Sequence, residues 1–243
     1  MNQTIQTPSK SAFEITRASD RGATEIGWLH GRHSFSFGRY FNPQRMNFRA
    51  LRVLNDDIVE PAAGFGEHGH DNMEIITWVL DGELAHRDST GNAGVIRPGD
   101  AQVMSAGTGI HHSEMNPSQT DRVHLLQIWL QPDVRGLQPA YAQKSFPVEG
   151  RANRWQLIAS PDARAGSLTI HQDATLSITN LTKDAQLAAV IPQSRFGYLH
   201  VAFGEVVVNG ETLRSGDAIS FSGPVNHGIN ATADSQLLLF DLA

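Results

Sequence analysis

Residues 75–88 read IITWVLDGELAHRD, which is the pattern of two β-strands joined by a tight turn. The first part, Ile75–Leu80, is β-branched, aromatic or otherwise apolar, and this composition favours a buried strand. Asp81-Gly82 follows as a turn signal, because glycine tolerates the positive φ that tight hairpin turns require. Glu83–Asp88 then predicts the returning strand. The stretch therefore predicts a β-hairpin.

The alternation of short strands and turns continues in both directions from this hairpin. Upstream, the apolar run Ala50–Leu54 predicts a strand that ends at Asn55-Asp56-Asp57, which we interpret as a turn cluster. Downstream, Arg97-Pro98-Gly99-Asp100 predicts a tight turn. Such spacing of strands and turns is typical of a sandwich or barrel, so we expect an all-β fold. Further strands are predicted at Ala101–Ser105, Val123–Leu130, Trp155–Ala159, Leu168–His171, Thr175–Thr179, Gly197–Phe203 and Leu237–Leu242.

The chain also carries a weak internal repeat. Gly82-Glu83-Leu84 precedes Arg97-Pro98-Gly99-Asp100, and Gly204-Glu205-Val206 precedes Arg214-Ser215-Gly216-Asp217 in the same order. Two matched turns favour a duplicated β-domain. The 243 residues suit two domains of about 100–150 residues each. Because the proline-containing stretch 131–150 looks like a connection, the expected domains are residues 1–135 and 136–243.

Composition excludes several classes of function. The formal net charge is −6 and no basic cluster is present, so direct binding to nucleic acid is not expected. The absence of cysteine excludes disulfides, thiolate metal sites and cysteine nucleophiles, so any metal must be held by His, Asp or Glu. Residues 1–10 are polar and look like a loose tail. Since we find no apolar signal segment and no run near the ~20 apolar residues of a membrane span, the expected location is the cytoplasm.

Two short motifs carry chemistry. They are His68-Gly69-His70 and His112-Ser113-Glu114. Residues i and i+2 of a strand point to the same face, so each motif would project two potential ligands in one direction. If the two strands lie close together, three imidazoles and one carboxylate surround one point. This nitrogen and oxygen set suits a divalent first-row transition metal.

The same alternation sorts the neighbouring residues. Only one of His111 and His112 can share the face of Glu114, and this is His112, so His111 should point away from the metal. Glu74 has the parity of His68 and His70 and is a second candidate carboxylate. Trp78 and Trp129 are expected in the core, and Phe65 is either core or pocket wall. The unpaired histidines are expected to be packing or surface residues; these are His86, His124, His171, His200 and His227.

Several strings around these motifs resemble the pirin family of cupins. The similarity covers most of the chain and is weakest after about residue 181. The strings are Gly64–His70, Met73–Thr77, Ala85–Asn92 and Ser105–Glu114. The resemblance implies a bicupin, with two jelly-roll β-barrels in tandem and metal only in the N-terminal one. In the second repeat, the region around His227 accordingly offers neither motif.

The resemblance also implies the ligand set, which falls on His68, His70, His112 and Glu114. It favours Glu114 over Glu74 as the metal carboxylate. One position departs from the family, because the residue between the first two histidines is usually proline and here is Gly69. Glycine loosens the backbone at this position.

Bacterial proteins that resemble this one are associated with quercetin 2,3-dioxygenase activity. This implies a flavonol-type substrate, O2, and release of CO on opening of the heterocycle. Fe(II) is the favoured cofactor, with Mn, Ni, Cu, Co or Zn as alternatives, and Glu114 is the expected general base as well as a ligand. The alternative is a non-enzymatic, iron-dependent regulator that acts through protein partners, as eukaryotic pirins are linked to transcription complexes.

Overall fold

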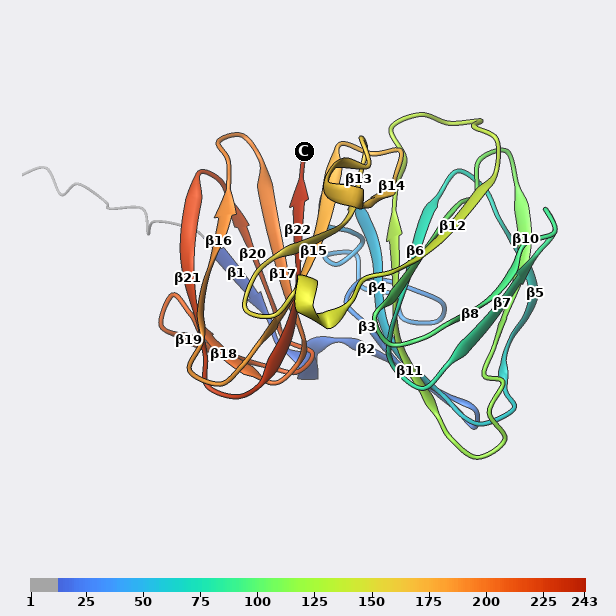
Figure 1. Ribbon diagram of the computed structural model, residues 1–243, viewed down its shortest axis with the longest axis horizontal. Helices are drawn as coiled ribbons and strands as arrows, with labels where there is room; N and C mark the ends of the chain where they lie inside the picture. Colours follow the sequence, from blue (N-terminus) through green and yellow to red (C-terminus); the bar gives the residue numbers. More distant parts are fainter. Residues whose placement is uncertain (1–12) are drawn as a thin grey trace, which may run out of the picture.

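The computed structural model describes residues 13–243, which form two β-barrels side by side (Figure 1). Each barrel consists of a seven-stranded sheet and a four-stranded sheet. The predicted all-β fold with two tandem cupin barrels is therefore confirmed. The loose tail expected at residues 1–10 lies outside the described residues. Between residues 13 and 243 the only helices are single 3-10 turns, too short to cross a membrane; they are η1 (Ala18–Asp20), η2 (Val148–Gly150) and η3 (Arg164–Gly166).

The N-terminal barrel contains most of the first half of the chain. Its larger sheet has the order β12 (Ala140–Ser145), β9 (Asp100–Ser105), β6 (Glu74–Asp81), β11 (Val123–Leu130), β4 (Leu51–Val59), β3 (Leu29–His33) and β2 (Gly22–Ile26). Its smaller sheet has the order β5 (Gly64–His70), β10 (Ile110–Met115), β7 (Leu84–Asp88) and β8 (Ala93–Ile96). Both chemical motifs lie in this smaller sheet.

The C-terminal barrel has the same plan. Its larger sheet has the order β1 (Phe13–Thr16), β20 (Ala218–Ser222), β17 (Phe196–Phe203), β22 (Ser235–Leu242), β15 (Ala174–Leu181), β13 (Gln156–Ser160) and β14 (Leu168–Thr169). Its smaller sheet has the order β16 (Gln186–Ile191), β21 (Val225–Ala231), β18 (Glu205–Val208) and β19 (Glu211–Arg214). Aliphatic side chains such as Leu199, Val206 and Ile229 fill its interior.

The two repeated turns have the same geometry in both barrels. Asp100 N–H donates to Arg97 O at 2.8 Å, and Arg97 N–H donates to the Asp100 carboxylate at 3.1 Å. The corresponding bonds between Asp217 and Arg214 have the same two lengths. This agreement is what the duplication hypothesis predicts.

The opening stretch forms two strands, but they do not pair with each other. β6 lies between β9 and β11 in the larger sheet, whereas β7 pairs with β8 and β10 in the smaller one. The predicted hairpin is therefore a corner between sheets. Gly82 has a φ of +76°, and a Cβ at this residue would lie 2.4 Å from Arg122 O. Glycine is required here because the chain turns directly against another backbone segment.

The interpretation of Asn55-Asp56-Asp57 as a turn cluster is wrong. These residues continue β4, which reaches Val59. Asn55 and Asp56 are tolerated inside this strand because their side chains have partners. The Asn55 side chain bonds to His33 at 2.8 Å, and Asp56 pairs with Arg21 at 3.1 Å. Asp57 is also buried and faces the barrel interior, on the side opposite Asp56.

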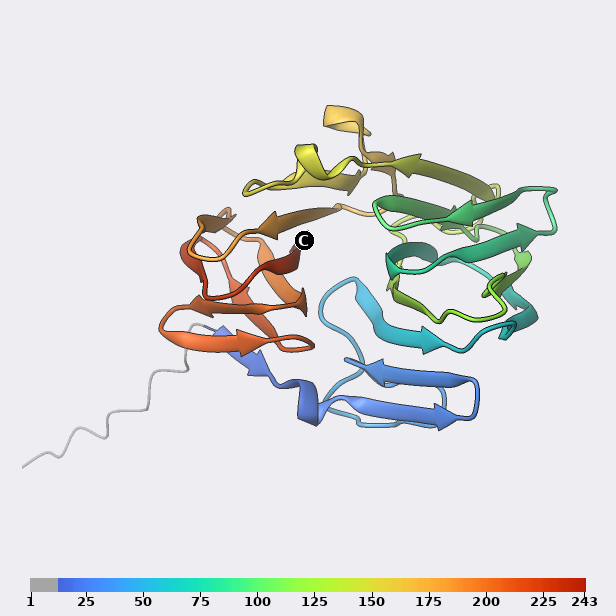
Figure 2. The ribbon, with the colours of Figure 1, turned by 60° about the horizontal axis from the view of Figure 1, so that its bottom comes forward.

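Two strands pair with the barrel on the other side of the boundary expected between residues 135 and 136. β12 follows this boundary but pairs with β9 of the N-terminal barrel. β1 precedes everything else described and pairs with β20 of the C-terminal barrel, whereas β2 and β3 belong to the N-terminal barrel (Figure 2). The division into residues 1–135 and 136–243 stays a prediction, and strand pairing ties the two parts together at both ends.

The largest apolar cluster lies between the barrels, where the two seven-stranded sheets face each other (Figure 1). Ile76 and Leu126 on one side join Leu176 and Phe240 on the other. Trp78 Nε1 donates to Gln236 Oε1 across this interface at 2.8 Å. Trp78 is thus a core residue, as expected, but of the interface. The N-terminal barrel holds a smaller apolar cluster around Leu125 together with buried polar groups.

Candidate metal centre

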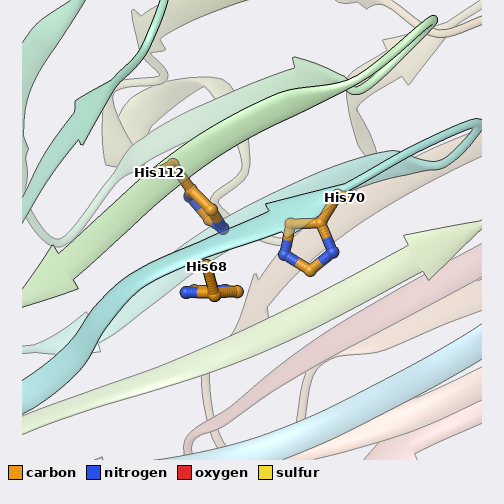
Figure 3. A group of neighbouring side chains, drawn as sticks. All are labelled: His68, His70 and His112. Atoms are coloured by element: carbon orange, nitrogen blue, oxygen red, sulfur yellow. The ribbon is translucent and has the colours of Figure 1, made fainter.

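Three imidazoles converge inside the N-terminal barrel (Figure 3). His68 and His70 project from β5, and His112 projects from the neighbouring β10, where it lies opposite His68. The ring centroids of His68 and His112 are 4.4 Å apart, and those of His70 and His112 are 4.9 Å apart. One nitrogen of each ring lies within 4.8 Å of those of the other two. The structure therefore brings these three predicted ligands together.

Strand alternation separates His112 from its neighbour as expected. His112 is 2% exposed, whereas His111 lies on the outer face of β10. There it is paired with Gly69 of β5, and a Cβ at Gly69 would lie 3.1 Å from His111 Nε2. The departure at Gly69 therefore leaves room for the His111 ring on the outside.

Glu114 is fully enclosed next to His112. Gln127 Nε2 donates to its two oxygens at 3.1 and 2.8 Å, and Thr77 Oγ1 lies 3.4 Å from one of them. A carboxylate oxygen lies within 4.8 Å of ring nitrogens of His112 and His86. Burial raises the pKa of Glu114, although the hydrogen bond from Gln127 acts in the opposite direction. Its role as a fourth ligand stays a prediction.

Hydrogen bonds fix which nitrogen the histidines offer. His68 Nδ1 lies 2.8 Å from Gly66 O and must carry the proton, which leaves Nε2 as the ligand atom. His86 Nε2 lies 3.2 Å from the Asp88 carboxylate, and His86 Nδ1 lies 3.5 Å from His112 Nδ1. In this series of hydrogen bonds, His86 Nε2 donates to Asp88, and His86 Nδ1 accepts from His112 Nδ1. The free atom of His112 is then Nε2.

His86 lies beside the candidate centre, a position that the sequence did not predict. It was expected to be a packing or surface residue, but it is buried beside His112 and stacks on Tyr141 with ring centroids 4.8 Å apart. A signal was available, because His86 and Asp88 have the same i, i+2 spacing as the two metal motifs. This spacing indicates two polar side chains on one inner face.

These residues fit a divalent transition metal. His112 Nε2 is buried and has no hydrogen-bond partner among residues 13–243, as expected of a ligand atom. Burial, with the nearby His68, lowers the pKa of His70 to about 4, and burial, with His68 and His70, lowers that of His112 to about 3. Both rings are therefore neutral at pH 7, the form that binds metals. Imidazoles with a carboxylate suit Fe, Ni, Cu or Zn.

Glu74 is not part of this cluster. It accepts a hydrogen bond from Ser105 Oγ at 2.7 Å and one from His171 N–H at 3.2 Å. The parity argument for Glu74 fails because β5 and β6 belong to different sheets, so alternation is lost at residues 71–73 between them. Glu74 instead lies against the C-terminal half, to which His171 belongs.

A cleft of about 450 Å³ leads to the candidate centre. His68, His70 and Glu114 line it, and three aromatic residues form its walls: Phe37, Phe65 and Trp129. Trp129 is half-buried: it packs against a core cluster that includes Ile75, as expected, but it also lines the cleft. Its ring meets that of His70 at a centroid distance of 4.8 Å. Phe65 proves to be pocket wall, where it packs edge-on against Trp28.

A row of buried polar side chains crosses the sheet beneath the centre. Thr77, Gln127, Asn55 and His33 are neighbours in register on β6, β11, β4 and β3. Thr77 Oγ1 donates to Gln127 Oε1 at 2.8 Å, and His33 bonds to Asn55 and to Thr24, both at 2.8 Å. This row positions Glu114 through Gln127 and forms the polar wall of the cleft.

The remaining histidines lie away from the cluster. His124 pairs with Asp56 at 2.6 Å, and His171 contacts Glu74. His200 is buried at the interface between barrels, and His227 packs against Phe221. Their expected role as packing or surface residues agrees with these positions.

Comparison with known families covers both barrels. The Pirin family model matches residues 14–130, and the model of the quercetinase C-terminal cupin domain matches residues 157–242. The chain belongs to the pirin family. Its N-terminal barrel, with the three convergent histidines, is the pirin barrel, and its aliphatic C-terminal barrel is the quercetinase-type cupin.

Individual pirin relatives extend over nearly the whole chain. A quercetin 2,3-dioxygenase of Escherichia coli K12 is 45% identical over 229 residues, which are 94% of this chain and 97% of the relative. A putative quercetin 2,3-dioxygenase of Mycobacterium bovis is 43% identical over 235 residues, or 96% of each chain. The crystal structure of the E. coli pirin YhhW in complex with nickel(II) is 44% identical, covers 95% of this chain and 98% of its own, and superimposes with a TM-score of 0.89.

Proposed function

We propose that this pirin is a metal-dependent dioxygenase that opens the heterocyclic ring of a flavonol such as quercetin with O2 and releases CO. The observation that carries the proposal is the cluster of three histidines at the end of an aromatic-walled cleft. The names of the similar bacterial proteins support it. Per turnover, one flavonol and one O2 give one carboxylate ester product and one CO.

In this proposal His68, His70, His112 and Glu114 hold a divalent metal ion. When bound, the ion supplies Lewis acidity that lowers the pKa of the flavonol 3-hydroxyl and an open position for ligands. The nickel complex of the YhhW pirin supports a divalent ion at this kind of site. We propose Fe(II) as the native ion. Elemental analysis of protein purified without added metal tests that choice.

The walls of the cleft suit a flat aromatic ligand. Phe37 and Trp129 pack edge to face with centroids 5.4 Å apart, and Phe65 lies beside His68. A volume of about 450 Å³ lies within the usual range for small-molecule sites, roughly 300–1,000 Å³. These side chains would orient the rings and exclude water from the reacting end.

Glu114 is the proposed proton acceptor. Burial raises the pKa of its carboxyl group, which brings its basicity closer to that needed at neutral pH. The two hydrogen bonds from Gln127 hold the carboxylate in one orientation. Glu114 would take the proton of the 3-hydroxyl and keep it inside the closed barrel.

Oxygen consumption tests the proposal. Protein reconstituted with Fe, Mn, Ni, Cu or Co should consume O2 while the flavonol absorbance decays, with CO formed in equal amount. His112→Ala and chelator-treated protein serve as controls and should be inactive. Absence of turnover with every one of these metals would contradict the proposal. The non-enzymatic regulatory role stays a prediction.

A further inference from the structure

Asp57 is a buried carboxyl group that the candidate metal centre does not use. It lies on the inner face of β4, is 3% exposed, and lines the same cleft as His68 and Glu114. Its Oδ1 atom has no hydrogen-bond partner in the part of the chain that the structure describes. Buried polar atoms without partners are rare in folded proteins, so this atom calls for a specific explanation.

The fold provides a defined space for this carboxyl group. Asp57 lies opposite Gly31 of β3, and a Cβ at Gly31 would lie only 2.6 Å from Asp57 Oδ1. Leu29 and His33, which flank Gly31 on the same face of β3, also line the cleft. The missing side chain of Gly31 therefore makes the room into which the carboxyl group fits.

The surroundings of Asp57 make an unpaired oxygen unfavourable. Its neighbour in register on β11 is Leu125, which belongs to an apolar cluster with Val79. A buried polar group without a hydrogen-bond partner is destabilising, and more so when it is charged. The adjacent Asp56, by contrast, points to the other face and is paired with Arg21 and His124. Among residues 13–243, Asp57 forms no such ion pair to account for its presence.

Asp57 can hydrogen-bond to a ligand hydroxyl whether its carboxyl group is protonated or ionised. Burial, with the charges of Asp56 and Glu114, raises the pKa of this carboxyl group to about 8. A protonated carboxyl both donates and accepts hydrogen bonds, and an ionised one accepts them. In either state the group can bond to a hydroxyl.

We propose that Asp57 is a substrate-anchoring residue, which hydrogen-bonds a second hydroxyl of a polyhydroxylated aromatic ligand whose first oxygen lies at the histidine cluster. This inference rests on the proposed function, because it makes Asp57 the residue that distinguishes between flavonols bound in that same cleft. A flavonol with only the 3-hydroxyl would leave Asp57 unsatisfied. The cleft therefore selects polyhydroxylated flavonols.

The test compares quercetin with 3-hydroxyflavone, which has only the 3-hydroxyl. Binding of each to nickel-loaded protein is measured without oxygen by fluorescence titration. The wild-type chain should bind quercetin about tenfold or more tighter than 3-hydroxyflavone, as expected for one buried hydrogen bond. Asp57→Leu should lose this preference and leave the affinity for 3-hydroxyflavone nearly unchanged. Asp57→Asn should retain part of it.

Two further variants complete the design. Gly31→Ala displaces the carboxyl group without removing it and should also reduce the preference. Asp133→Asn changes an exposed carboxylate and should behave as wild type. Nickel content and circular dichroism show whether each variant is folded.

Equal preference in the wild type, Asp57→Leu and Gly31→Ala would overturn the inference. So would a wild-type chain that binds both flavonols equally. The proposed function fails on different evidence, the absence of O2 consumption, and anaerobic binding does not depend on that reaction.

Discussion

His86 holds the ring of His112 on the side away from the candidate metal position. The chain of contacts from Asp88 through His86 to His112 Nδ1 leaves Nε2 of His112 available. Groups that orient a ligand in this way also raise its basicity. The ligand set alone therefore does not describe the centre.

Replacing His86 should weaken metal binding without unfolding the protein. Phenylalanine keeps a ring to stack on Tyr141 but removes the acceptor for His112. We expect His86→Phe to raise the dissociation constant for Ni(II) by about 10–100-fold, measured by competition with a coloured chelator. The matched control is His111→Phe, which alters an exposed neighbour of His112. Equal affinities for both variants would show that His86 does not support the ligand.

The two buried glutamates should respond differently to the same change. Glu114→Gln removes the carboxylate charge beside His112, and we expect it to lose most of the bound metal. Glu74→Gln lies with Ser105 and His171 and should keep it. Metal content after gel filtration, determined by elemental analysis, measures both. Loss of metal from Glu74→Gln with retention in Glu114→Gln would refute the ligand assignment.

For the strands, local sequence patterns predicted where a strand lies better than they predicted which strands pair. Ile75–Leu80 and Val123–Leu130 are strands as expected, because β-branched and apolar runs of this length suit buried sheet. The motif on β10 was also interpreted correctly, since parity holds within a single strand. The convergence of His68 with His112 needed the two strands to be neighbours, which the family resemblance implied.

The failures of prediction have one physical cause, which is tertiary context. Asn55–Asp57 has the composition of a turn, yet partners on β3 and β11 allow Asn55 and Asp56 inside a strand. Asp81-Gly82 is a good hairpin signal, yet it turns between sheets. The same error hid Asp57, because a residue assigned to a turn is not considered for the inner wall of a barrel.

β1 should contribute stability to the barrel at the other end of the sequence. Ile15 is paired with Ile219 of β20 and packs on the aliphatic core of the C-terminal barrel. Because Ile15 is only partly buried, Ile15→Ala should lower the free energy of unfolding by about 1–2 kcal/mol, below the range for fully buried sites. Urea denaturation measures this, with the exposed Glu14→Ala as control. An unchanged urea midpoint for Ile15→Ala would indicate that β1 does not stabilise the barrel.

On the scale of the whole molecule, the two barrels are joined by the largest apolar cluster, which lies between them. His200 lies in this interface on β17, and neither ring nitrogen has a hydrogen-bond partner within residues 13–243. Burial, with the positive charge of Arg21, lowers the pKa of His200 to about 3, against the opposing effect of Asp56 and Asp217. The folded protein therefore keeps this histidine neutral.

The burial of His200 in its neutral form makes the free energy of unfolding depend on pH. The unfolded chain protonates His200 near pH 6.5 and the folded one only near its pKa of about 3, so stability falls as the pH drops through that window. Between pH 7 and pH 5 the contribution is about 2 kcal/mol. His200→Leu should remove this part of the slope in urea denaturation. Parallel pH profiles for wild type and variant would contradict the assignment.

The pairing of β1 with β20 sets an order of events during synthesis. Ala18 N–H bonds to the Asp217 carboxylate, a residue made 199 positions later. At about 5–20 residues per second, the first described strand waits roughly 10–40 seconds for its partner. All strands of the N-terminal barrel are made during that interval. On the ribosome, the barrel with the histidine cluster can thus be formed while β1 is still an unpaired strand beside it.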